Sequence, residues 1–238
     1  MSATPPPLPP LPPAPERTRA QRRAADPWPR FVPVLWFFGL YLLTSVAFAV
    51  YVRATGDDHP AADAVVTGID AALVLAFAWR ERREILPLLR CANLGPRTLA
   101  LTAAVALGMG ALVEGWFWLA AFVFEFDTYL GPYREHGCPA WMAVVLIVVC
   151  PAVFEEIAFR GFLLARLTPL LGTRDALLLQ ATLFAIIHVS PVVFPSHFLI
   201  GLCLGWLRLR TGSLWPGVVL HAAWNLKVLV AEGLLHGW

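Results

Sequence analysis

Three groups of polar residues in the second half of the chain combine side chains that can carry out hydrolysis. These groups are Glu155, Glu156 and Arg160, then Phe184 and His188, and finally His221 and Asn225. Each group lies in a stretch that is apolar enough to enter a lipid bilayer. An ionisable side chain at membrane depth costs several kcal/mol, so it is interpreted as functional by default. We therefore expect these side chains to converge on one site that faces the protein interior.

The spacing within each group places its members on one helical face, because residues four positions apart are neighbours on a helix. Glu156 and Arg160 are expected to form an ion pair, which would neutralise a buried carboxylate and hold the arginine in place. His221 and Asn225 share a face in the same way. The pattern predicts one free carboxylate, Glu155, beside one paired carboxylate, with donors from other helices facing both.

Such a set of side chains favours direct attack of water on a carbonyl group. A carboxylate shielded from bulk water can take a proton from a water molecule near neutral pH, and a neighbouring histidine can orient that water or pass the proton on. A second histidine and an asparagine amide can donate hydrogen bonds to the oxyanion that develops. No serine or cysteine is placed as an obvious nucleophile. The alternative is a buried polar network that only packs helices together.

The elements that position these residues are expected to be membrane-spanning helices. The 238 residues are 58% hydrophobic and only 14% charged, whereas soluble domains are about 25% charged. A helix needs roughly 20 residues to cross the hydrocarbon core. We therefore predict an all-α, polytopic transmembrane helical bundle of about seven spans, within a range of six to eight. The candidate spans are 31–52, 61–79, 98–124, 139–165, 176–190, 196–209 and 213–235.

The chain is expected to divide into a short arm and a single transmembrane domain. Residues 1–30 are rich in proline and then in arginine, a composition that favours disordered, solvated chain. The transmembrane domain covers residues 31–238, and its first span is too long for the apolar core of a signal peptide. Arginines alternate between the loops so that the positive-inside rule places the N-terminus in the cytoplasm, the C-terminus outside and the protein in the cytoplasmic (inner) membrane.

The remaining polar and small residues suggest other roles. The net charge of +2 and the scattered arginines give no basic face, so we expect no nucleic-acid partner. The four cysteines lack C-x-x-C spacing and indicate neither a disulfide framework nor a zinc finger. Asp70 and Glu114 are expected to be structural or to line a cavity, and Gly201 with Gly205 to allow close helix packing. Four histidines near predicted span ends are expected to be solvated: His59, His136, His197 and His236.

The order of the three motifs resembles that of a known family. E-E-x-x-x-R, then F-x-x-x-H, then H-x-x-x-N, spread over transmembrane helices, is similar to the CPBP family. This family comprises the type II CAAX prenyl endopeptidases and their bacterial relatives, also called Abi proteins. The resemblance covers about residues 139–235, which would be the catalytic region. It implies an intramembrane endopeptidase that cuts near the C-terminus of a membrane-tethered or lipidated protein.

The resemblance also implies a role for each motif residue. Glu155 would be the general base with His188 beside it, and His221 with Asn225 would form the oxyanion site. Glu156, Arg160 and Phe184 would be supporting residues. The family has been described both as metal-dependent and as glutamate-type. Zinc held by Glu155, Glu156, His188 and His221 is the alternative. Because no compact ligand motif such as H-E-x-x-H is present, we favour a site without a metal or another cofactor.

Other functions stay open at the level of sequence. Some bacterial relatives act as sorting enzymes on the C-terminal anchors of surface proteins, and fold-level resemblance does not fix a substrate. Intramembrane glutamates and histidines also serve transporters as proton relays, but the chain lacks the two repeated halves typical of transporters. A non-catalytic bacteriocin-immunity protein is the third alternative. It would tolerate Glu155→Gln, whereas a hydrolase would not.

Overall fold

A computed structural model describes residues 27–90 and 94–236, and these residues form helices and connections without a β-strand. The long separate helices are α2 (Trp28–Thr55), α3 (Pro60–Arg80), α5 (Pro96–Ala120), α10 (Thr173–Ile186), α11 (Phe194–Thr211) and α12 (Trp215–Ala231). Short helical turns are α4 (Arg82–Ile85), η1 (Leu86–Leu89) and α6 (Gly131–Glu135). The segment Ala140–Leu171 is one continuous helix of 32 residues. Its parts are α7 (Ala140–Ala143), η3 (Val144–Val149), α8 (Cys150–Glu155), η4 (Glu156–Leu163) and α9 (Leu164–Leu171).

Each predicted span overlaps a helix, with ends that differ by several residues, and the fold is a helical membrane bundle. Within residues 27–90 and 94–236, four helices are long and apolar enough to qualify as spans by length and composition: α2, α3, α5 and the continuous helix Ala140–Leu171. Helices α10 and α12 have 14 and 17 residues, fewer than the roughly 20 that a perpendicular span needs. Seven spans therefore stays a prediction. The predicted arm falls mostly on residues 1–26, outside the described residues, and α2 already begins at Trp28.

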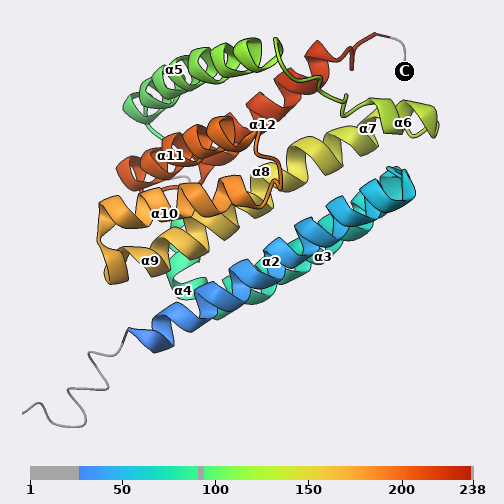
Figure 1. Cartoon of the computed structure of the whole chain (residues 1–238). Helices are drawn as coiled ribbons and strands as arrows, with labels where there is room; N and C mark the ends of the chain where they lie inside the picture. The colour runs from blue at the N-terminus through green and yellow to red at the C-terminus, as the bar shows by residue number, and fades with distance from the viewer. Residues whose placement is uncertain (1–26, 91–93, 237–238) are drawn as a thin grey trace, which may run out of the picture.

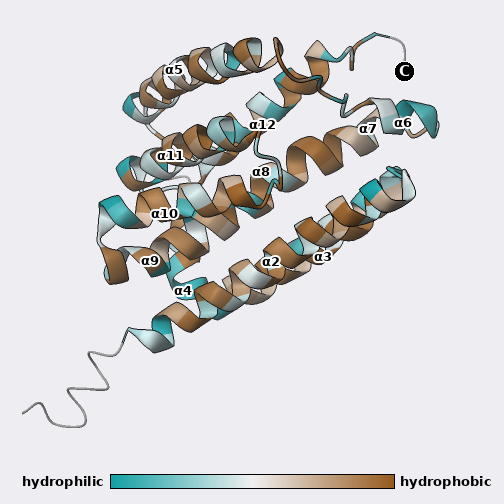
Figure 2. Ribbon diagram, viewed as in Figure 1, coloured by the Kyte–Doolittle hydropathy of each residue, from teal (hydrophilic) through white to brown (hydrophobic). Residues whose placement is uncertain are grey.

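The continuous helix Ala140–Leu171 runs through the centre of the bundle (Figure 1). Helices α2 and α3 lie side by side and pack along it on one side, while α10 and α12 pack against it on the other. Helix α11 packs on α10, α12 and α5, which leaves α5 at the edge. Hydrophobic residues dominate the middles of α2 and α3, and hydrophilic residues gather near their ends (Figure 2). That distribution suits helices surrounded by hydrocarbon.

The element η4 is enclosed on every side. All eight of its residues are buried, including Glu156 and Arg160. A helix that is buried all round needs neighbours on every face, and η4 has them in α3, α10, α11 and α4. Both η4 and η3 are π-helical, a wider winding that often occurs at functional sites. The polar residues of the first motif thus lie at the most enclosed part of the molecule.

Two glycines allow α10 and α11 to approach closely. A Cβ atom on Gly201 would lie 2.8 Å from the Cα atom of Ala181, and one on Gly205 would lie 2.6 Å from Leu177 Cδ1. The buried Gln180 donates a hydrogen bond from Nε2 to the Gly201 carbonyl oxygen at 2.8 Å. The predicted packing role of the G-x-x-x-G sequence is therefore confirmed.

The two intramembrane carboxylates outside the motifs make contacts between helices. Thr44 on α2 donates from Oγ1 to Asp70 Oδ1 on α3 at 2.5 Å. Glu114 on α5 forms an ion pair with Lys227 on α12. Both carboxylates thus join neighbouring helices, which agrees with the structural role expected for them.

Candidate active site

The centre of the site is a buried ion pair between Glu156 and Arg160. Both residues are 0% exposed, and Arg160 Nη1 donates to Glu156 Oε1 at 2.9 Å. The guanidinium carbon of Arg160 also lies 4.3 Å from the ring centroid of Phe184 on α10, a cation–π contact that gains strength where water is excluded. The ion pair expected from the sequence spacing is present, and Phe184 connects it to the second motif.

His221 on α12 bridges the two glutamates. Its Nδ1 lies 3.2 Å from Glu156 Oε1, and its Nε2 lies 3.8 Å from Glu155 Oε2. An ionised carboxylate can only accept, so Nδ1 carries the proton toward Glu156 when that glutamate is charged. The separation of 3.8 Å exceeds hydrogen-bond length, so the two atoms are near neighbours without a direct hydrogen bond. A water molecule beside the pair could form hydrogen bonds with both atoms.

The Glu156 carboxylate fits against α12 because Gly217 has no side chain. A Cβ atom at this position of α12 would lie 2.6 Å from Glu156 Oε2. Real Cβ atoms do not approach an oxygen this closely, so any other residue would push the carboxylate away. Gly217 precedes His221 by one turn of the same helix. Helix α12 therefore supplies both the space for Glu156 and the imidazole that contacts it.

Several polar atoms of the site are buried without a partner in the described part of the chain. They are Glu155 Oε2, Glu156 Oε2, and the Nε and Nη2 atoms of Arg160. Buried polar groups are nearly always hydrogen-bonded, so these atoms call for partners such as water or a substrate. The exposed fraction of the Glu155 side chain is 14%, against 1% for that of Glu156. Of the two adjacent carboxylates, Glu155 is the more accessible.

His188 lies beyond the end of α10, in the turn after Ile186 rather than inside a helix. Its Nδ1 is 2.8 Å from the Phe184 carbonyl oxygen, and its ring centroid is 5.0 Å from that of Phe184. Because a carbonyl oxygen can only accept, Nδ1 donates, and Nε2 of the neutral ring keeps its lone pair. The predicted helix over 176–190 is wrong at this end, since the helical hydrogen bonds stop before His188.

His197, in the first turn of α11, is a neighbour of the site that the sequence did not indicate. The expectation that it is solvated is wrong: its ring centroid lies 3.8 Å from that of His188, and the residue is half-buried. The sequence separation of nine residues gives no helical periodicity that would join the two. The only signal available was the short Ser190–Pro195 break, which brings the end of α10 back to the start of α11.

Asn225 lies one turn after His221 on α12 and contacts the continuous helix. Its Nδ2 donates to the Ile147 carbonyl oxygen of η3 at 2.9 Å. An amide nitrogen carries two protons, and this bond uses one of them. The structure therefore brings six of the seven predicted residues together. The seventh, Asn225, lies beside them and contacts the backbone of η3.

The residues of the alternative zinc set are not arranged as a ligand shell. Within residues 27–90 and 94–236, no three His, Cys, Asp or Glu side chains are grouped so that they could hold a metal ion. Glu156 Oε1 already accepts from Arg160 and from His221. His188 directs Nδ1 to a backbone carbonyl and packs against His197. Because His188 Nε2 and Glu155 Oε2 are not used by these contacts, the preference for a site without a metal stays a prediction.

Comparison with known proteins finds a family match over the region that contains the three motifs. Residues 137–227 match the family model described as type II CAAX prenyl endopeptidase Rce1-like. No match was found among curated proteins or among solved structures. The matched segment contains all seven motif residues, from Glu155 on α8 to Asn225 on α12. The apolar helices make the chain an integral membrane protein, and the match over residues 137–227 supports membership of the CPBP family of CAAX-type intramembrane proteases.

Proposed function

We propose that the protein is an intramembrane endopeptidase that hydrolyses a peptide bond near the C-terminus of a membrane-tethered protein, using water activated by Glu155. The single observation that carries this proposal is the geometry of Glu155. Its Oε2 is buried, lacks a hydrogen-bond partner within the described residues, and lies 3.8 Å from His221 Nε2. Beside it, Glu156 is neutralised by Arg160. One carboxylate is thus available as a base, and the other is held in an ion pair.

The proposed reaction needs only the groups of the site and one water molecule. Glu155 takes one proton from the water as its oxygen bonds to the carbonyl carbon of the substrate. The carbonyl oxygen becomes an oxyanion, which accepts hydrogen bonds from protonated His221 and from the second amide proton of Asn225. The carbon–nitrogen bond then breaks, and the proton held by Glu155 passes through His188 to the leaving nitrogen. Arg160 and Phe184 keep Glu156 and His188 in place.

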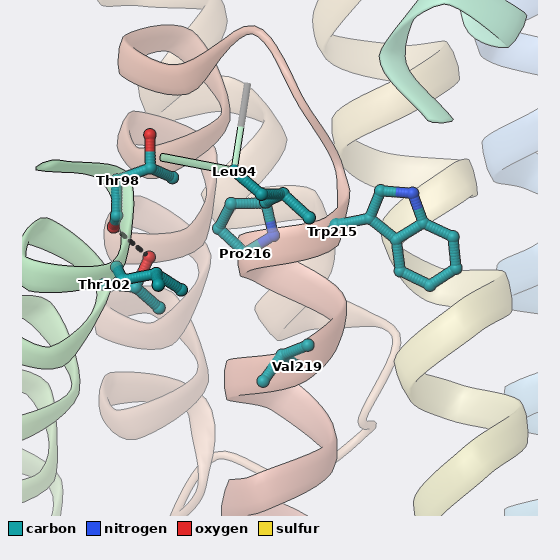
Figure 3. A pocket seen from close by; sticks show the side chains of 7 residues that line it. Leu94, Thr98, Thr102, Trp215, Pro216 and Val219 are labelled. Atoms are coloured by element: carbon teal, nitrogen blue, oxygen red, sulfur yellow. Dashed lines mark hydrogen bonds between the residues drawn. The ribbon is translucent and has the colours of Figure 1, made fainter. Parts of the chain in front are cut away.

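The matched family and a pocket next to the site favour a lipidated substrate. A pocket of about 230 Å³ lies between the start of α5 and the start of α12. Figure 3 shows Pro216 of α12 opposite Thr98 and Thr102 of α5, and Trp215 and Val219 of α12 also line the pocket. Pockets for small molecules have volumes of about 300–1,000 Å³. The smaller volume here suits a few carbons of an aliphatic chain.

The position of this pocket relates it to the site. Pro216 lies against the pocket, and the next residue, Gly217, lies against Glu156. The same turn of α12 therefore contacts both the pocket and the carboxylates. A lipid chain seated between α5 and α12 would tether its peptide within reach of Glu155.

The test of the peptidase activity is detection of new peptide termini by mass spectrometry. Purified protein is mixed with membrane proteins of its host, as wild type, as Glu155→Gln, and as wild type with a chelator. Glu114→Gln is the matched control. Glu114 on α5 is also an intramembrane glutamate, but it forms an ion pair with Lys227 on α12. We expect new termini with wild type and Glu114→Gln and none with Glu155→Gln. Cleavage that persists in Glu155→Gln would refute a glutamate-activated water, and loss of cleavage with chelator would favour metal.

The test of lipid recognition fills the pocket. Val219→Trp should raise KM for a farnesylated, internally quenched CAAX peptide about fivefold or more, since each CH₂ kept out of an apolar site costs about 0.8 kcal/mol, or roughly fourfold in affinity. The same change should leave cleavage of the peptide without its lipid unaltered. Leu226→Trp is the control, because Leu226 is exposed on the same helix away from the pocket. Equal effects of both variants would contradict a role of the pocket.

A further inference from the structure

His188 and His197 form a close pair of imidazole rings beside the site. Their centroids are 3.8 Å apart, with an angle of 46° between the planes. Both rings also contact Phe184, at 5.0 Å for His188 and 6.1 Å for His197. His221 lies at the same 6.1 Å from Phe184. The ring of His197 is thus as near to the Phe184 ring as that of His221.

Each ring of the pair is anchored in the same way. Nδ1 of His188 lies 2.8 Å from the carbonyl oxygen of Phe184, four residues earlier. Nδ1 of His197 lies 3.0 Å from the carbonyl oxygen of Val193, also four residues earlier, and 3.2 Å from Ser196 Oγ. A carbonyl oxygen only accepts, so both Nδ1 atoms donate. Rotation of either ring would break its bond to the backbone, and rotation of one would collide with the other.

The backbone between the two histidines is held in an uncommon conformation. Val189 has a φ of 49°, a left-handed value that is a genuine outlier for a β-branched residue. Such strain persists only where the surroundings enforce it, and it gathers at functional sites. Here the indole Nε1 of Trp116 on α5 donates to the Val192 carbonyl oxygen at 2.9 Å. The turn is therefore fixed from outside, in the form that brings His197 against His188.

From these contacts we infer that His197 is a positioning residue of the peptidase site, whose anchored ring holds the His188 imidazole in the orientation that leaves Nε2 available to the reacting groups. This inference rests on the proposed function only for its effect on catalysis. His188 lies beyond the last turn of α10, so its neighbours in the helix restrain it less than those of His221 do. A flat ring at position 197 supplies that restraint from the next helix.

The test compares side chains at position 197 that keep or remove the flat ring. His197→Ala and His197→Leu should lower kcat for the farnesylated CAAX peptide about tenfold or more, with KM changed less than about threefold, because the loss concerns orientation of a reacting group. His197→Phe retains the ring without its anchor and should keep at least about a third of kcat. His136→Ala is the matched control. The His136 ring also packs on another histidine ring, that of His59, with 4.2 Å between the two centroids, but this pair lies away from the site.

A second measurement is independent of any substrate. Full-length protein labelled with ¹⁵N at histidine and placed in lipid nanodiscs reports the tautomer of His188 directly. One tautomer with Nδ1 protonated is expected in wild type and His197→Phe, and a mixture in His197→Ala and His197→Leu. An unchanged His188 signal in His197→Ala would overturn the inference, as would His197→Phe being as inactive as His197→Ala. If Glu155→Gln retained full activity, the proposed function would fail, while this spectrum would still judge the positioning role.

Discussion

Glu155 and Glu156 are consecutive in the chain but occupy different electrostatic surroundings. The Glu156 side chain contacts a guanidinium and an imidazole and fills the space left by Gly217. Glu155 Oε2 lies 3.8 Å from His221 Nε2, a separation longer than a hydrogen bond. At the scale of single residues, the proposed difference between a base and a structural charge therefore depends on the partners of each carboxylate, and not on residue type.

This contrast predicts that the same substitution mainly affects cleavage at position 155 and mainly affects stability at position 156. Glu155→Gln should abolish peptide cleavage while changing the free energy of unfolding by less than about 1 kcal/mol, because no ion pair with a full positive charge is lost. Glu156→Gln should destabilise the protein by about 3–5 kcal/mol, because it leaves Arg160 buried without its counter-charge. Unfolding in mixed micelles titrated with SDS, together with the cleavage assay, measures both.

A double variant checks the cause of that destabilisation. Glu156→Gln combined with Arg160→Met removes both charges and should recover most of the lost stability. If the double variant is as unstable as the sum of the two single variants, the ion pair does not account for the effect. Cleavage by the double variant should stay low, because the cation–π contact of Arg160 with Phe184 is lost as well.

At the scale of elements, α12 determines the shape of the site through Gly217. We predict that Gly217→Ala lowers kcat by roughly tenfold or more, because its Cβ would displace Glu156 Oε2 and a misplacement of about 1 Å can cost a hundredfold in rate. Gly110→Ala on α5 is a suitable control, since a Cβ there would meet only Trp224 at 3.8 Å. Equal activity of the two variants would contradict the role assigned to Gly217.

The contact between α10 and α11 makes a second prediction at this scale. Gly201→Ala should destabilise the protein by about 1–3 kcal/mol, because the added methyl group would meet the backbone of Ala181 and force the helices apart. Gly108→Ala on α5 has nothing within 4 Å of the new Cβ and should be neutral or stabilising by up to about 1 kcal/mol. The SDS titration compares them, and equal destabilisation would argue against close packing as the cause.

The elements also show how far sequence patterns predict this fold. Apolar runs of sufficient length mark helices, because the bilayer leaves the backbone few alternatives, and the i,i+4 spacing correctly paired Glu156 with Arg160. The place of His197 could not be obtained in this way, since it follows from the strained turn at Val189 and the hydrogen bond from Trp116. Periodicity reports which residues share a helix face, whereas a non-local turn brings together residues from two helices.

For the whole molecule, the arrangement of the helix ends predicts where the termini lie. Helix α12 begins beside η1, where Leu214 N donates to the Leu88 carbonyl oxygen, and Arg166 of α9 contacts Arg30 near the start of α2. Helix α12 ends at the opposite end of the bundle, where Leu130 N donates to Glu232. Figure 1 shows α2 beginning and α12 ending at opposite ends.

We predict that a reporter fused before α2 is cytoplasmic and that one fused after α12 is external, as the arginine pattern requires. Fusions to a cytoplasm-active fluorescent protein and to a phosphatase active only outside the cytoplasm measure this. A fusion in the exposed α2–α3 connection near Asp58 is the control and should behave like the fusion after α12. Activity of both terminal fusions on one side would rule out seven spans.

The enclosure of η4 gives the surrounding lipid a part in the reaction. Because every residue of η4 is buried and the Glu155 side chain just before it is only 14% exposed, we expect a polypeptide to reach Glu155 more readily when neighbouring helices move aside. Such a motion works against the lateral pressure of the bilayer, and product release needs it again. The turnover rate should therefore change with the acyl-chain length and the fluidity of the surrounding membrane. The lipid would regulate the protease without binding to any site on it.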